Sequence, residues 1–406
     1  MKRRTVLSAA TFFISILLTL SFSSVYAKDV RGVTDDTIKV GIIADLSGPA
    51  TVYSLQIIEG IKNYTRYVHE KGNIHGRKIK FITEDSHYTV PGSIAGFKKL
   101  VFRDKIFALL YGSDSGSMKV LEGRCDKNKV PFITSALSDT MAPPFAPFSR
   151  YTFFGVGAYS EGIVLMLDYI MNDLGEKDPK IAYIGPDNEM GSAGLKICRK
   201  YAKAHGFELT NTEVLSPGAM DATSQVLNTK KAKAEYVIIH SFYGPTAAFL
   251  KGCYKFAYSP KKVFGGATTC GVPTVQLAGK AAKNFMATSY FSLWFMDGPG
   301  LKKMREITLK YKPGTEKPYR DWVYTHGWVM ATLLERALKG AGTSLTPEAV
   351  VNELESLRDF DTDGLSGPYT CTPDDHHGFK YNRLYKADIE KTLLVPVTGW
   401  RKVNLP

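Results

Sequence analysis

The chain has 406 residues and a formal net charge of +13, from 52 lysine and arginine residues against 39 aspartate and glutamate residues. This length is too great for one ordinary hydrophobic core and indicates two lobes. The basic residues stand in short scattered groups such as 230–233 rather than in dense runs with aromatic residues, which argues against a nucleic-acid-binding protein.

The N-terminus has the pattern of a secretory signal. Residues 2–4 are basic, residues 6–20 are apolar, and residues 25–27 have the small-x-small form of a cleavage site. We therefore expect residues 1–27 to be a signal peptide that is cleaved after Ala27, and the protein to be exported to the periplasm. The strongly apolar stretch favours the general secretory route over a twin-arginine route. No later segment reaches the ~18 apolar residues that a membrane-spanning helix needs.

From residue 38 onward the chain alternates β-rich and helix-like segments. The expected strands are runs of β-branched or apolar residues at 38–43, 78–84, 106–110, 131–134, 180–184, 235–240 and 262–265. The expected helices lie between them, at about 53–70, 91–103, 116–127, 158–174, 192–205, 222–230 and 245–257. This alternation is typical of an α/β fold in which helices cover both faces of a parallel sheet.

The pattern restarts in the middle of the chain, because 160–265 repeats the rhythm of 38–134, and this favours two similar α/β lobes over one large sheet. The last third differs. Two helices are expected at 299–312 and 319–340, and Thr346 followed by Pro347 has the N-cap and first-turn chemistry that opens another. The polar, turn-rich segment 366–398 predicts β-hairpins.

The five cysteines show none of the paired spacings of metal or thioredoxin-like sites: they are Cys125, Cys198, Cys253, Cys270 and Cys371. A disulfide is possible outside the cytoplasm, and we expect one between Cys253 and Cys270. Buried free thiols are the alternative.

Several stretches, in this order, resemble the type I periplasmic substrate-binding proteins of ABC transporters, of the branched-chain amino acid (Leu/Ile/Val) binding type: 40–53, 74–79, 111–117, 130–136 and 180–194. The resemblance covers about 37 to 400. It implies an α/β fold of two Rossmann-like lobes that are joined by three crossing strands, near 156–158, 289–295 and 366–370, with a ligand held between the lobes. The N-terminal lobe would be 28–156 plus 292–367, and the C-terminal lobe 157–290 plus 368–400.

The resemblance also implies a ligand site at the ends of strands, where helix N-termini and hydroxyl groups supply hydrogen-bond donors. The loop 112–116 is similar to the one that holds the ligand carboxylate, with Ser113 and Ser115 as the hydroxyls. The loop 135–138 is similar to the one that completes this subsite, through Ala136 and Ser138. Helix capping is the alternative role for these serines.

Aromatic and apolar side chains are expected to form the walls of this site. The turn 47–50 after the first strand would shape the rim of the cleft and position Tyr53, although Tyr53 could equally pack inside the first lobe. The resemblance places Tyr159, Met190 and Tyr243 at the cleft as well. Any one such residue is more often part of the core.

The sharpest departure from the family pattern lies at Thr268 and Thr269. Amino-acid-binding members typically carry an acidic residue near this place, which pairs with the α-ammonium group of the ligand. A threonine cannot neutralise a buried ammonium, and a buried charge that loses its partner costs about 3–5 kcal/mol. We therefore expect an aromatic or other amine-free carboxylate at least as much as an amino acid.

The function that the resemblance implies is capture of a small organic ligand, an amino acid or an aromatic or aliphatic carboxylate, for delivery to an ABC permease. We expect a monomer that binds neither nucleic acid nor a metal nor another cofactor. A periplasmic sensor for a signalling receptor is the alternative. An enzyme is the weaker one, since its only tempting cluster, His376 and His377, is expected in a solvated hairpin loop without metal-ligand spacing.

Overall fold

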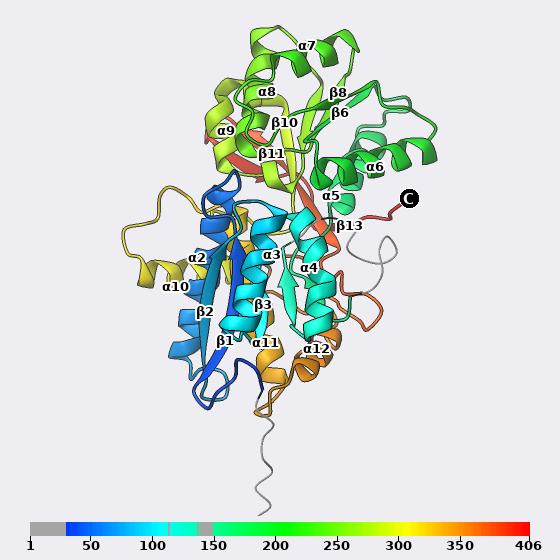
Figure 1. The fold of residues 1–406 in the computed structure, drawn as a ribbon. Helices are drawn as coiled ribbons and strands as arrows, with labels where there is room; N and C mark the ends of the chain where they lie inside the picture. The colour runs from blue at the N-terminus through cyan, green and yellow to red at the C-terminus, as the bar shows by residue number, and fades with distance from the viewer. Residues whose placement is uncertain (1–29, 113, 136–137, 139–148) are drawn as a thin grey trace, which may run out of the picture.

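A computed structural model describes residues 30–112, 114–135, 138 and 149–406. These residues form two α/β lobes, each built around its own sheet (Figure 1). In Figure 1 the first lobe, blue and cyan, lies below the second lobe, green, and the orange helices of the last third lie with the first lobe. The α/β fold class expected from the alternation of elements is confirmed.

The sheet of the first lobe has five parallel strands in the order β2-β1-β3-β4-β5. The strands are β1 (Thr37–Ala44), β2 (Lys78–Asp85), β3 (Ala108–Leu110), β4 (Phe132–Thr134) and β5 (Thr152–Phe154). The helices that follow them are α2 (Thr51–Glu70), α3 (Val90–Lys98), continued by a π-helical turn (Lys99–Arg103), and α4 (Ser115–Asn128). Because all five strands are parallel, their carboxyl ends meet at one edge, which faces the second lobe.

The sheet of the second lobe has the order β12-β11-β10-β9-β8-β6-β7, with β13 paired to β11. Its parallel strands are β6 (Ile181–Gly185), β7 (Asn211–Val214), β8 (Tyr236–Ile239), β9 (Lys262–Gly265) and β10 (Phe285–Ser289), and its antiparallel ones β11 (Tyr381–Asp388), β12 (Leu393–Pro396) and β13 (Arg401–Lys402). Its helices are α5 (Tyr159–Asp168), continued by a π-helical turn (Tyr169–Asp173), α6 (Glu189–Ala204), α7 (Thr223–Lys231), α8 (Tyr243–Lys255) and α9 (Val272–Ala278), with 3₁₀ turns at Ala267–Thr269 and Gly279–Asn284.

Three helices of the last third pack with the first lobe: α10 (Pro299–Tyr311), α11 (Trp322–Gly340) and α12 (Pro347–Glu355). The helices α2 and α11 approach closely at two glycines. A Cβ atom at Gly60 would lie under 3.0 Å from the carbonyl oxygen of Tyr324, and one at Gly327 equally close to that of Ile57. The close approach brings the first turns of α11 to the same edge of the sheet as the first turns of α2.

The chain passes between the lobes three times, from β5 to α5, from β10 to α10 and from α12 to β11. Two of these passages pair at Phe291 and Ser366. The hydroxyl of Tyr290 donates to the carbonyl oxygen of Ala158, and a Cβ atom at Gly157 would collide with the Tyr290 ring. Only a glycine at 157 therefore lets the first two passages pack together.

Sequence patterns missed three short strands, and each omission has a physical cause. β7 reads Asn-Thr-Glu-Val at the edge of its sheet, where alternate residues are half-exposed, so it has no apolar run. β5 and β10 are short and fully buried, and their sequences contain threonine and serine. The π-helical turns after α3 and α5 were expected as ordinary helix.

Two other expectations were wrong. All five cysteines are free and buried, so Cys253 and Cys270 form no disulfide and instead pack as small apolar side chains. His376 and His377 do not lie in a solvated loop, because they are only 3% and 8% exposed. The His376 ring stacks on Phe153 at 3.9 Å between ring centroids and contacts Glu355, so long-range packing buries this polar segment.

Within the described ranges, no helix has the length and apolar character needed to cross a membrane. The same ranges contain no cluster of three histidine, cysteine, aspartate or glutamate side chains placed to bind a metal ion. The expected signal peptide, residues 1–27, lies outside the described residues.

Candidate functional site

A cavity of about 60 Å³ lies between the lobes, where the carboxyl ends of the first-lobe strands face the second lobe. First-lobe residues supply most of its lining, and the second lobe closes it: Ala50, Tyr53, Ile57, Tyr88, Tyr111, Asp114, Ser115, Ser135, Trp322, Val323 and His326 against Tyr159, Met190, Phe242 and Thr268. For comparison, an apolar cavity of about 150 Å³ binds benzene. The lobes must therefore separate or rearrange before a ligand of that size can enter.

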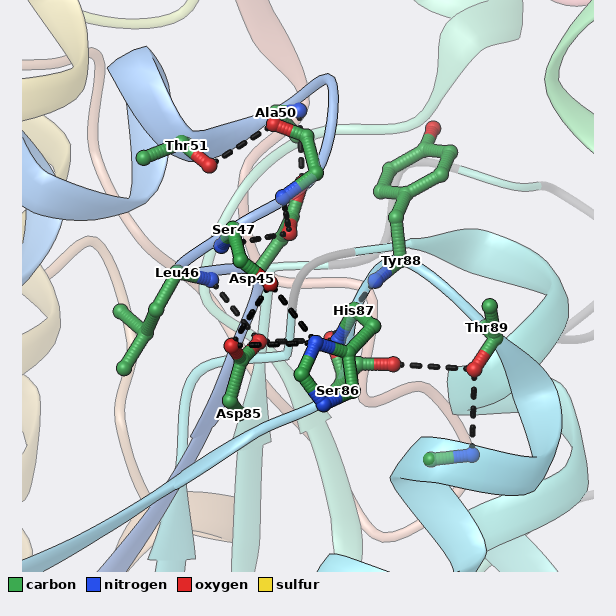
Figure 2. Close-up of polar contacts among 12 residues, drawn as sticks. Asp45, Leu46, Ser47, Ala50, Thr51, Asp85, Ser86, His87, Tyr88 and Thr89 are labelled. Atoms are coloured by element: carbon green, nitrogen blue, oxygen red, sulfur yellow. Dashed lines mark hydrogen bonds and ion pairs between the residues drawn. The ribbon is translucent and has the colours of Figure 1, made fainter.

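The turn after β1 is built around the buried carboxylate of Asp45. Its oxygens accept hydrogen bonds from the backbone N–H groups of Gly48 at 2.6 Å and Ala50 at 2.7 Å (Figure 2). A Cβ atom at Gly48 would lie 2.7 Å from the same carboxylate, so the glycine is required there. This turn starts α2 at Thr51 and places Tyr53 in its first turn. The expectation that residues 47–50 position Tyr53 agrees with this geometry.

A second turn, after β2, holds Tyr88 at the cavity. The carboxylate of Asp85 accepts hydrogen bonds from the backbone N–H of His87 at 2.8 Å and from the hydroxyl of Ser47 at 2.8 Å (Figure 2). Both His87 and Tyr88 have positive φ, 53° and 56°, a region that non-glycine residues rarely adopt. The hydrogen bonds of Asp85 stabilise this strained turn. The turn places the Tyr88 ring in the lining of the cavity, where it contacts Phe242 of the second lobe edge-on.

Tyr53 joins the two lobes directly. Its hydroxyl donates to the backbone carbonyl of Thr268 at 2.8 Å and accepts from the backbone N–H of Tyr243 at 3.1 Å. Its ring packs against those of Phe242 and Tyr243, with centroids 5.2 and 4.5 Å apart. Since all these partners belong to the second lobe, the structure is a closed form in which Tyr53 is the central contact.

The loop before α4 brings two polar groups to the cavity. The Ser115 hydroxyl is 3.4 Å from the hydroxyl of Tyr159 in the second lobe. Asp114 is the N-cap of α4 and accepts the backbone N–H of Ser117 through Oδ1 at 2.7 Å. Its Oδ2 is buried without a hydrogen-bond partner among the described residues, and burial raises the pKa of this carboxyl. Asp114 is the one acidic residue in the described lining, which contains no lysine or arginine.

The loop after β4 makes a different contact between the lobes. The hydroxyl of Ser138 donates to Oε1 of Glu189 in the second lobe at 2.7 Å. Ser135, which begins the expected loop 135–138 but was not singled out as a ligand contact, lines the cavity, and its hydroxyl donates to the carbonyl of Gly112. In this closed form the Ser138 hydroxyl is thus engaged across the cleft, and its expected role in ligand binding stays a prediction.

The predicted site residues divide into three groups. Those that line the cavity are Tyr53, Ser115, Tyr159, Met190 and Thr268. Ser138, Tyr243 and Thr269 do not line it: the Ser138 hydroxyl donates to Glu189, the Tyr243 ring packs behind Tyr53, and the Thr269 hydroxyl donates to the carbonyl of Gly266 at 2.7 Å. Ser113 and Ala136 lie outside the described residues.

Sequence reasoning expected a helix at 319–340 but did not place its first turns at the site. Trp322, Val323 and His326 line the cavity although they are more than 200 residues from Tyr53 in the chain. The preceding Asp321 is fully buried: Oδ1 accepts the backbone N–H of Trp322, and a Cβ atom at Gly271 of the second lobe would collide with Oδ2. Burial raises the pKa of Asp321 to about 7. An aspartate before a helical pattern suggests only an N-cap, so no local signal indicated a site here.

Both a family model and curated relatives match this chain. A family model described as periplasmic binding protein matches residues 37–392. A curated relative, Leu/Ile/Val-binding protein homolog 7 of Brucella abortus, is 23% identical over 260 residues, which are 61% of this chain and 63% of the relative. The chain therefore spans slightly less than two thirds of the length of the curated relatives it matches first.

Solved structures share the fold over nearly the whole chain. A branched chain amino acid ABC transporter protein from Thermus thermophilus with bound valine superposes with a TM-score of 0.83 and 23% identity, covering 92% of this chain and 98% of that one. A fatty acid ABC transporter substrate-binding protein from Thermomonospora curvata superposes with a TM-score of 0.80 and 21% identity, covering 93% of this chain and 95% of that one. A solute binding protein from R. palustris in complex with 4-hydroxybenzoate superposes with a TM-score of 0.77 and 17% identity, covering 91% of this chain and 98% of that one.

Proposed function

Because the chain belongs to the periplasmic binding protein family, we propose that it captures a small organic molecule between its two lobes and delivers it to an ABC-transporter permease. The observation that carries the proposal is the cavity between the lobes, which residues from both lobes line and which the hydrogen bonds of Tyr53 close. The family is one of binding proteins, and we propose that this chain likewise binds its ligand without turning it over.

The proposed ligand is an amino acid or an aromatic or aliphatic carboxylate. The ligands bound in two of the structural neighbours, valine and 4-hydroxybenzoate, are both small carboxylates. In this chain the Ser115 hydroxyl and the N-terminus of α4 are the donors that we assign to the carboxylate. The aromatic rings of the lining, Tyr53, Tyr88 and Phe242 among them, would contact the rest of the molecule.

Among the described residues that line the cavity, those of the second lobe include no acid for an α-ammonium group. The Thr268 hydroxyl donates to the carbonyl of Ser241 at 2.6 Å, and the Thr269 hydroxyl is buried in its own turn. This supports the expectation of an amine-free carboxylate at least as much as an amino acid. Asp114 in the first lobe is the remaining candidate, so an amino acid would have to place its ammonium group against Asp114.

The proposed mechanism is a hinged closure. Ligand first binds to one lobe in the open form, and the other lobe then closes by bending at the three passages between them. The ligand shifts the equilibrium toward the closed form only by the contacts that it makes with both lobes in that form. We assign 28–156 plus 292–367 to the N-terminal lobe, 157–290 plus 368–400 to the C-terminal lobe, and a monomeric, periplasmic mature protein to the chain after Ala27.

A thermal-shift screen with valine, benzoate, 4-hydroxybenzoate and a medium-chain fatty acid tests the proposal. A ligand bound only by the folded protein at 100 times its Kd stabilises it by about 2.7 kcal/mol, which raises the melting temperature. Small-angle scattering with the best ligand should then show a smaller radius of gyration than without it. No shift with any of these compounds or the other amino acids, or an unchanged radius at saturation, would contradict the proposal.

A further inference from the structure

Two aromatic side chains of α11 bring unpaired polar atoms to the cavity. Trp322 and His326 are 2% and 1% exposed, and both line the cavity. The indole Nε1 of Trp322 is buried without a hydrogen-bond partner among the described residues. The ring nitrogens of His326 make no hydrogen bond of full geometry there, and the ring has a weaker polar contact with the backbone of Gly155, which leaves at least one nitrogen unpaired. Buried polar groups in native proteins nearly always have partners, and for an unpaired group in the lining of a cavity a bound ligand or water can supply the partner.

The two rings are held in fixed orientations. The His326 ring stacks on Phe291 with 4.9 Å between centroids and an angle of 15°, and the Trp322 ring is tilted by only 9° from that of His326 at 5.9 Å. Their unpaired nitrogens are thus preorganised rather than free to reach other protein atoms, which is typical of a binding site.

We propose that Trp322 and His326 form a second polar subsite of the ligand cavity, which binds an uncharged oxygen of the ligand, a hydroxyl or a carbonyl. This inference rests on the proposed function and narrows it to carboxylates that carry such an oxygen as well. Trp322 supplies an N–H donor. Burial lowers the pKa of His326 to about 3, so its ring is neutral and offers one donor and one acceptor.

The oxygen is uncharged because the anionic end of the ligand is already assigned to Ser115 and the N-terminus of α4. The described lining contains no lysine or arginine, so a second anion held by two neutral rings would be buried without a counter-charge. A hydroxyl suits the pair best, since it can accept from one ring N–H and donate to the unprotonated nitrogen of His326.

Matched acids that differ by one oxygen test the subsite. The probes are benzoate with 4-hydroxybenzoate, and 4-methylpentanoate with 4-methyl-2-oxopentanoate, measured by calorimetry on the full chain. We expect the oxygenated member of at least one pair to bind about 3- to 10-fold more tightly, the scale of one or two neutral hydrogen bonds. In Trp322→Phe and His326→Phe the ratio of the two affinities within that pair should fall toward one, while the acid without the extra oxygen keeps its affinity.

Trp328→Phe is the matched control, because Trp328 lies in the same helix and is buried but does not line the cavity. It should keep the preference for the oxygenated acid. Equal binding within both pairs, or a preference that survives in Trp322→Phe and His326→Phe, overturns the inference. If none of the four acids binds, the inference is also overturned, whereas the proposed function fails only if amino acids and fatty acids give no response either.

The ligand-free protein gives a second readout. An unpaired buried polar atom that serves ligand binding destabilises the ligand-free protein. Its removal in His326→Phe should therefore leave the melting temperature unchanged or raise it by about 2 °C. A fall of several degrees would show that His326 serves the fold through internal water, and would overturn its assignment to the ligand.

Discussion

At the scale of single residues, closure depends on a few oxygen atoms at the cleft. The Tyr53 hydroxyl pairs with two backbone groups of the second lobe that water would otherwise solvate. In the open form these groups are hydrated, so each hydrogen bond contributes its modest net value to closure only while both partners remain. Removing the hydroxyl leaves two backbone groups buried and unpaired in the closed form alone.

Tyr53→Phe should therefore shift the protein toward the open form. Each unpaired buried group costs about 1–3 kcal/mol, so we expect ligand affinity to fall tenfold or more and the radius of gyration at subsaturating ligand to rise. Tyr67→Phe is the control, because Tyr67 lies in the same helix outside the cavity lining. Equal affinity in Tyr53→Phe and the wild type would contradict this role.

Ser115→Ala tests the carboxylate subsite. A hydrogen bond to a charged group is worth about 1.5–3 kcal/mol, so carboxylate ligands should bind roughly ten- to a hundredfold more weakly in calorimetry. Ser117→Ala is the control, since Ser117 lies two residues further along the first turn of α4 and does not line the cavity. A loss of similar size in both variants would indicate a damaged α4 rather than a lost ligand contact.

At the scale of elements, the contact between α2 and α11 delivers residues from opposite ends of the chain to one cavity. Tyr53 and Ile57 come from α2, and Trp322 and His326 from α11. The helices can approach this closely because Gly60 and Gly327 present bare backbone to each other. The site thus depends on a packing contact outside the cavity lining.

Gly60→Ala should disturb that contact. Its Cβ would lie under 3.0 Å from backbone atoms of α11, which cannot yield as a flexible side chain does. We expect a loss of about 1–3 kcal/mol in the free energy of unfolding by chemical denaturation, with weaker ligand binding. Gly123→Ala in α4, where a Cβ meets open space, should instead stabilise the protein by about 0.5–1 kcal/mol. Full stability of Gly60→Ala would show that the helices can separate freely.

At the scale of the whole molecule, closure places an ionisable group between the lobes. Asp321 belongs to α11 of the first lobe, and its Oδ2 lies against Gly271 and near the Tyr243 ring of the second. Burial raises the pKa of this carboxyl from its usual 3.8 to about 7. The closed form therefore holds a proton that an open, solvated Asp321 would release.

Closure should consequently weaken as pH rises. For an acid whose pKa is raised in one state, that state is favoured fully below about pH 4 and loses its advantage progressively up to about pH 7. Scattering without ligand should show a larger radius at pH 8 than at pH 5. Asp321→Asn, which stays uncharged, should remove this difference. A radius independent of pH in the wild type, or the same dependence in the variant, would contradict the role of Asp321.

Sequence by itself determined most of the elements and the two-lobe organisation. Runs such as 38–43 and 262–265 and the capping residues Thr346 and Pro347 gave element positions within a few residues, because periodic burial and terminal hydrogen bonds are local properties. The family resemblance of the sequence also indicated Tyr53, Ser115 and Thr268, which line the cavity.

Only the tertiary structure decided which distant side chains complete the cavity and which polar residues are buried. Trp322 and His326 carry no local signal, because their place depends on how α11 packs against α2. The burial of His376 and the free thiols of Cys253 and Cys270 depend likewise on contacts between segments far apart in the chain. The spacing of apolar residues shows which face of a helix or strand is apolar, but it does not show which other segment packs against that face.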